Sequence, residues 1–218
     1  MRKSLLVIGI FSWILCSGCN YGPGVAVDSA SATGGPPSPA LLQYAEDLTR
    51  SWSARYSAKS WKTEIDDIRP AGPVHIVTEG VCPDRYRVVV TGSENSETIY
   101  VGKTMYSRTG KSRWVQNPMP TSYQGLQSCG TTRANDVDPA RIRLIADQLK
   151  EVELSKPTIR EFGARQCREW TRSFQTGKRP YMSSSCYDIK THDLVHAVTG
   201  TTVTTYYWNI PIDIHPPI

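Results

Sequence analysis

Short runs of β-branched and aromatic residues, separated by residues typical of turns, constrain the fold more than any other feature of this sequence. The first run, Trp61–Ile65, alternates apolar with polar residues, as a half-buried strand does. The expected strands are Trp61–Ile65, His75–Thr78, Tyr86–Val90, Glu97–Val101, Thr104–Arg108, Gln166–Phe174, Tyr181–Ile189, Leu194–Thr199 and Thr202–Asn209. Short connections favour antiparallel neighbours, so we expect one curved antiparallel sheet of about eight or nine strands.

Two segments have the period of a helix instead. Pro39–Ala58 has apolar residues three or four positions apart, and Pro39 suits a first helical turn. These residues are Leu41, Ala45, Leu48, Trp52 and Tyr56. Asp138 is a good N-cap, Pro139 a good first residue, and a second apolar stripe extends to about Glu151. Both stripes need an apolar partner, so we expect an α+β fold in which two helices cover one face of the sheet.

The N-terminus has the pattern of an export leader. Met1–Lys3 is basic, and Ser4–Ile14 is an apolar run too short to span a bilayer, which takes about 20 residues. Ser17 and Gly18 then precede Cys19, and small residues directly before a cysteine resemble the lipobox of bacterial lipoproteins. The resemblance implies that residues 1–18 are a signal peptide and that Cys19 bears the lipid. By resemblance to Gram-negative sorting rules, Asn20 implies the outer membrane.

Two alternatives to lipidation remain, because Cys16 stands where a lipobox usually has leucine. Cleavage after small residues would release a soluble protein, and an uncleaved leader would leave a one-span anchor. Residues 19–39 comprise the expected lipidated N-terminus and a segment rich in Gly, Pro, Ser and Ala. This composition predicts a flexible tether with a reach of about 25 Å. The folded domain is expected over residues 40–218.

Four further cysteines indicate an oxidising compartment: Cys82, Cys129, Cys167 and Cys186. An even number in an exported chain favours two disulfides, for which three pairings are possible. Cys167 and Cys186 lie in consecutive expected strands, which favours a bond between them and leaves Cys82 with Cys129. A zinc site is the alternative, but the spacing of the cysteines does not support it and no histidine cluster accompanies them. We expect no metal and no cofactor.

The charge balance gives little reason to expect a nucleic-acid partner. The net charge is +5, and loss of Arg2 and Lys3 with the leader would lower it to +3. Basic residues occur only in short isolated clusters such as Arg141 and Arg143. The membrane, reached through the N-terminal lipid, is the partner that the sequence favours.

A weak family resemblance extends over roughly residues 40–215. Pro83–Tyr86, then Ile99–Tyr106, Gly110 and Trp114, follow the order of motifs in lipoprotein-carrier (LolA/LppX-like) envelope proteins. The segments Cys186-Tyr187-Asp188 and Tyr207–Ile214 are similar to the close of the same group. The resemblance implies a half-open barrel lidded by helices. Several members hold acyl chains between sheet and helices, and others of this shape are sensor domains or have no known ligand.

Catalytic signatures are weak. His192 and Asp193 lie in an expected turn, where Asp is common. Ser183–Ser185 could complete a Ser–His–Asp set, but three serines on a strand do not form the sharp turn, or nucleophile elbow, that exposes a catalytic serine. The carboxylate pairs Asp66–Asp67 and Glu151/Glu153 have no histidine partner in register and suit a solvated surface. We therefore expect no enzymatic activity.

Aromatic residues gather near the first helix and the last strand, where they either line an apolar cavity or fill the core. They are Tyr44, Trp52, Tyr56, Trp61, Tyr206, Tyr207 and Trp208. The candidate ligand-binding residues are Trp52, Tyr56, Trp61 and Tyr207. We expect a lipid-anchored, periplasm-facing envelope protein that binds a lipid or another hydrophobic ligand between sheet and helices. The alternative is a structural or sensing module with a filled core and an envelope protein as its partner.

Overall fold

A computed structural model describes residues 35–93, 95–119, 137–150, 152–176 and 179–217. Contacts within the chain divide it between Gly35 and Pro36, and Pro36–Ile218 is one compact unit. The expected signal peptide, the lipidation site Cys19 and most of the expected tether lie outside the described residues.

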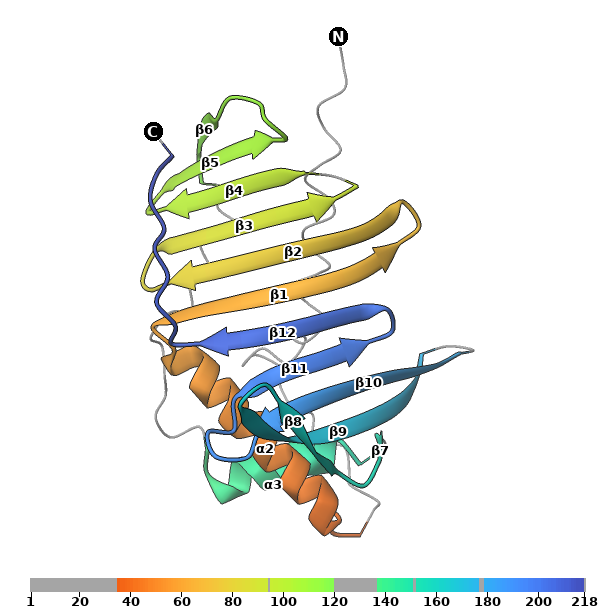
Figure 1. Ribbon diagram of the computed structural model, residues 1–218. Coiled ribbons are helices and arrows are strands. Elements are labelled where there is room, and N and C mark those ends of the chain that lie inside the picture. Colours follow the sequence, from red (N-terminus) through yellow and green to blue (C-terminus); the bar gives the residue numbers. More distant parts are fainter. Residues whose placement is uncertain (1–34, 94, 120–136, 151, 177–178, 218) are drawn as a thin grey trace. The chain divides into compact units, whose positions relative to one another are not determined.

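The described residues form an α+β fold with one large curved antiparallel sheet that does not close into a barrel (Figure 1). The strand order is β6-β5-β4-β3-β2-β1-β12-β11-β10-β9-β7, and β8 also pairs with β9. The strands are β1 Ser60–Arg69, β2 Gly72–Val81, β3 Arg85–Gly92, β4 Ser96–Val101, β5 Thr104–Thr109, β6 Val115–Pro118, β7 Glu153–Leu154, β8 Thr158–Phe162, β9 Arg165–Thr176, β10 Arg179–Asp188, β11 Leu194–Thr199 and β12 Thr202–Trp208.

The strand count is higher than the sequence predicted. All nine expected strands are present, and β6, β7 and β8 are added at the edges of the sheet. These three are short, from two to five residues, and mostly exposed. Pairing with a longer neighbour defines such strands, because their own sequence lacks a buried face.

The helices begin where the sequence predicted. Helix α2 is Pro39–Ser57, and the Ser38 hydroxyl accepts a hydrogen bond from the backbone N–H of Leu41 at 3.2 Å. Helix α3 is Pro139–Gln148, and Asp138 accepts from the N–H of Arg141 at 2.8 Å. It ends before the expected Glu151, because Leu149 leaves helical geometry. Neither described helix has the length and apolar content that crossing a bilayer requires.

Helix α2 has two buried stripes, of which the sequence predicted one. Leu41 and Ala45 pack against Ile145 and Ala146 of α3, with Leu48 and Trp52 beside them, whereas Tyr56 is exposed. The second stripe contacts the sheet. There the Tyr44 ring centroid lies 5.5 Å from that of Trp170 on β9 and 6.4 Å from that of Tyr187 on β10. Helix α2 therefore packs against both α3 and the β9–β10 part of the sheet.

A disulfide joins Cys167 of β9 to Cys186 of β10, the pair that the strand pattern predicted, with 5.4 Å between the Cα atoms. Both residues are buried and pack with Val195 and Phe162. Cys82 is also disulfide-bonded, and its predicted partner Cys129 lies outside the described residues.

Candidate functional site

The face of the sheet that α2 contacts continues from β9 to the middle of the sheet. Directly paired residues project from the same face of a sheet. Ser185 of β10 pairs with Trp170 and with Ala197 of β11, Ala197 pairs with Thr204 of β12, and Thr204 pairs with Ile65 of β1. We call the face that contains these residues the helix-side face.

A line of directly paired residues crosses six strands of the helix-side face. It consists of Trp208, Trp61, Gly80, Tyr86, Tyr100 and Met105, from β12 through β1 to β5, and is called the aromatic row below. Ring centroids lie 5.4 Å apart for Trp61 and Tyr86, and 5.8 Å apart for Tyr86 and Tyr100. Tyr206 stacks on Trp208 at 6.1 Å. Six strands at about 4.8 Å spacing give the row a length of about 24 Å.

Charged side chains are absent from this part of the helix-side face. Beside the aromatic row, two further lines of paired residues cross β1–β5. They are Thr63, Thr78, Val88, Thr98 and Ser107, and Ile65, Ile76, Val90, Ser96 and Thr109. None of the described residues in these three lines is Asp, Glu, Lys, Arg or His. Six of the ten residues in the two further lines are Ser or Thr, so the apolar surface is concentrated in the aromatic row. The row suits an apolar ligand, because an unpaired charge would make burial of hydrocarbon costly.

Most charges of these strands lie on the opposite face, and the pair Asp67–Arg69 lies on the helix-side face at the far end of β1. The carboxylate of Glu97 accepts hydrogen bonds from Arg87 Nε at 2.8 Å and from Arg108 at 2.6 and 3.0 Å. Burial acts to raise the pKa of Glu97, but the hydrogen bonds from Arg108 and Arg87 outweigh it, and the pKa lies below its ordinary value. Antiparallel sheets commonly have one apolar and one water-facing face, which explains this division.

A second charged group on the opposite face involves a predicted ligand-binding residue. Lys62 Nζ lies 2.6 Å from Glu64 Oε1, and the Tyr207 hydroxyl donates to Glu64 Oε2 at 3.1 Å. The hydrogen bond with Lys62 is the main cause that lowers the pKa of Glu64, and it also raises the pKa of Lys62. Tyr207 is therefore part of a solvated polar surface.

The structure does not bring the four predicted ligand-binding residues together. Trp61 lies in the aromatic row, Tyr207 is on the other face, Trp52 packs with α3, and Tyr56 is exposed near the end of α2. Trp61 is instead grouped with Tyr86, Tyr100 and Trp208. Among these three, only Trp208 was expected from the sequence to line a cavity or fill the core. Tyr86 and Tyr100 lie in expected strands, but the register that aligns them with Trp61 is not visible in the sequence.

The C-terminal segment passes one end of the strands (Figure 1). Asn209 accepts from the N–H of Lys59 at 2.9 Å, and the Ser60 hydroxyl donates to the carbonyl of Ile210. Arg85 at the start of β3 donates to the carbonyl of Ile214 at 3.4 Å. The alternating sequence Ile210–Ile214 thus crosses the ends of β1 and β3 without forming a strand.

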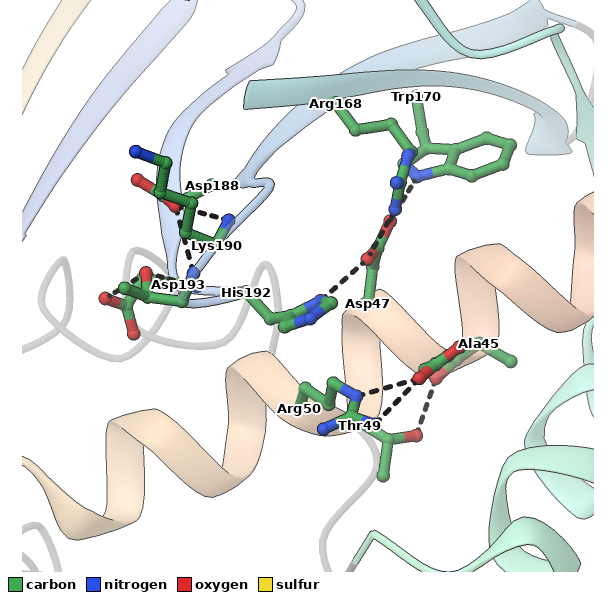
Figure 2. Close-up of polar contacts among 12 residues, drawn as sticks. Ala45, Asp47, Thr49, Arg50, Arg168, Trp170, Asp188, Lys190, His192 and Asp193 are labelled. Carbon is green, nitrogen blue, oxygen red and sulfur yellow. Dashed lines mark hydrogen bonds and ion pairs between the residues drawn. The ribbon is translucent and has the colours of Figure 1, made fainter. Parts of the chain in front are cut away.

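A buried polar cluster fixes α2 to the sheet, and Figure 2 shows its side chains converging from three elements. The carboxylate of Asp47 in α2 is 1% exposed and accepts from Arg168 Nη1 at 2.9 and 3.0 Å and from Trp170 Nε1 at 2.9 Å. His192 Nδ1 lies 3.1 Å from Asp47 Oδ1, and its residue has a left-handed backbone with φ of 59°. The cluster is not predictable from the sequence, because a single Asp on a helix resembles a solvated residue.

The suggested Ser–His–Asp set is not formed. Ser183 accepts from Arg172 Nε at 2.6 Å, and Asp193 accepts from the Thr191 hydroxyl at 2.8 Å. His192 contacts Asp47 instead. The surface pair Asp66–Asp67 also differs from expectation, because Asp66 pairs in register with His75 and lies 2.7 Å from its Nδ1.

Comparisons with known proteins give two distant structural likenesses. No protein-family model matches the chain, and no curated protein matches it. A crystal structure of a DUF1329 family protein from Desulfovibrio piger is 10% identical, and the match covers 79% of this chain and 95% of that one with a TM-score of 0.20. An outer membrane lipoprotein-sorting protein domain from Vibrio parahaemolyticus is 7% identical, and the match covers 78% of this chain and 90% of that one with a TM-score of 0.20. At this TM-score neither likeness supports an argument, and the function rests on the residues of the site itself.

Proposed function

We propose that this protein is a lipid-anchored protein of the cell envelope that binds an uncharged hydrocarbon ligand, such as the acyl chain of a lipid. The ligand lies on the helix-side face of β12 and β1–β5. The observation that supports the proposal is the aromatic row, which lies beside two lines of paired residues that also contain no charged residue. Binding is driven by removal of apolar surface from water, at about 25 cal/mol per Å².

The burial of individual residues favours a second candidate function. Ile76, Val88 and Tyr100 on the helix-side face are buried, whereas Trp61 and Tyr86 are half-buried. If this face were filled by the chain itself, the protein would be a structural or sensing module with an envelope protein as its partner. In both cases its action is binding, not catalysis, and its site needs no metal, cofactor or nucleic acid.

Two tyrosines on opposite faces give a matched test of ligand binding. Tyr86→Ala removes a central member of the aromatic row, so we expect palmitate to bind about tenfold more weakly. Tyr207→Ala removes the same side chain from the charged face, and palmitate affinity is expected to stay unchanged. Native mass spectrometry of the protein purified under oxidising conditions is expected to show added mass that gentle activation releases as a lipid. A bare mass together with no saturable palmitate binding would favour the structural or sensing module.

The anchor is tested separately, because its sequence lies outside the described residues. Cys19→Ala is expected to leave an unprocessed precursor without diacylglycerol, since the cysteine that resembles the lipidated residue is gone. Ser31→Ala, in the expected tether, is the control, and this variant should be processed and labelled with lipid as the natural chain is. Normal processing and lipid labelling of Cys19→Ala would refute the lipobox assignment.

A further inference from the structure

Gly80 occupies the one position of the aromatic row that has no side chain. It lies on β2 between Trp61 of β1 and Tyr86 of β3. Its φ is outside the left-handed range, so the backbone does not require glycine here. Glycine in the interior of a strand weakens it and often marks a close approach of another group.

The approaching group is the indole of Trp61. A Cβ atom on Gly80 would lie 2.5 Å from Trp61 Cε2 and 2.9 Å from Cζ2, and it would also overlap Nε1. Real Cβ contacts are longer, so alanine at this position would force the indole away from the sheet. The indole therefore lies across β2, in the space that a side chain would fill, and reaches Tyr86 on the next strand.

We infer that Gly80 is the positioning residue of the aromatic row. Its lack of a side chain lets Trp61 bridge β2, and the bridge joins Trp208 and Trp61 to Tyr86 and Tyr100 in one continuous track. This inference rests on the proposed function and adds to it the course of the ligand. A single extended hydrocarbon chain follows the row across the strands and does not run along them.

The length of the row agrees with this ligand class. The hydrocarbon core of a bilayer is about 30 Å thick, so one acyl chain in one leaflet spans about 15 Å. The row extends about 24 Å and can accommodate a whole chain. Interruption at β2 would leave two shorter apolar pieces, and neither would contact the full length of the chain.

A double-mutant cycle in the full chain tests the inference, with palmitate as the probe and calorimetry as the measurement. Gly80→Ala is expected to weaken palmitate binding about tenfold, and Trp61→Ala to weaken it by a similar factor. In the Trp61→Ala background, Gly80→Ala is expected to have no further effect, because the displaced indole is already absent. Gly35→Ala is the control, since a Cβ there meets nothing within 4 Å.

The outcomes separate this inference from the proposed function. Palmitate binding that Gly80→Ala leaves unchanged, or losses that add in the double variant, would overturn the role of Gly80 and leave the proposed function in place. Absence of saturable binding by the natural chain would overturn both. If Gly80→Ala does not fold, recovery of folding by added Trp61→Ala supports the overlap with the indole, and failure to recover contradicts it.

Discussion

Asp47→Asn is expected to lower the free energy of unfolding by about 3 kcal/mol, the range found when one partner of a buried ion pair is removed. Asp47 is the only carboxylate that the described contacts place against Arg168 Nη1, and it also accepts from Trp170. Asparagine retains one oxygen acceptor but no charge. The guanidinium of Arg168, whose side chain is 21% exposed, would then lack a counter-charge in a largely desolvated position.

The neighbouring residue on the same helix is the matched control for Asp47→Asn. Glu46 forms an ion pair with Arg50 at 2.9 Å, and both side chains are about two-fifths exposed, at 40% and 43%. Exposed pairs of this kind contribute about 0–1 kcal/mol, so Glu46→Gln should change stability little. Urea unfolding with the disulfides intact measures both variants, at an unchanged m-value. Equal losses for the two substitutions would show that the buried cluster does not fix α2 to the sheet.

Local signals explain the parts of the fold that the sequence predicted. Ser38 with Pro39, and Asp138 with Pro139, are capping pairs whose geometry depends on a few neighbouring residues. The nine expected strands have their own apolar residues and turn residues at their ends. The edge strands β7 and β8 were missed, because pairing with β9 defines them and not their own pattern.

The candidate site depends on distant pairing and was predicted only in part. Trp61 was predicted, but its neighbours in the aromatic row are set by the registers that join β12, β1, β2, β3 and β4. Tyr207 and Trp208 are adjacent in the sequence and project from opposite faces of β12. A change of strand register by one residue would exchange their faces, so the sequence alone does not show which of the two joins the aromatic row. The burial of Asp47 likewise depends on Arg168 and Trp170, which are far from it in the chain.

Replacement of both Cys167 and Cys186 by alanine is expected to lower the free energy of unfolding by about 3 kcal/mol. The residues are 19 positions apart, and a cross-link that closes a loop of this length restricts the unfolded chain by about that amount. Alanine suits the site better than serine, because both cysteines are buried among apolar side chains and a hydroxyl there would lack a partner. The disulfide of Cys82 stays intact in this variant.

Reduction separates the cross-link from the packing of its sulfur atoms. Reductant should lower the free energy of unfolding of the natural chain, obtained from urea unfolding with a fitted m-value, through both disulfides. It should lower that of the double alanine variant only through the disulfide of Cys82. Each protein is compared with itself before and after reduction, so the packing lost in the double alanine variant cancels. The change in the free energy of unfolding of the natural chain, minus that of the variant, is therefore the contribution of the Cys167–Cys186 bond. Equal effects of reductant on the two proteins would show that this bond contributes nothing to stability. A difference of about 3 kcal/mol would agree with the stabilisation expected when a cross-link restricts the unfolded chain.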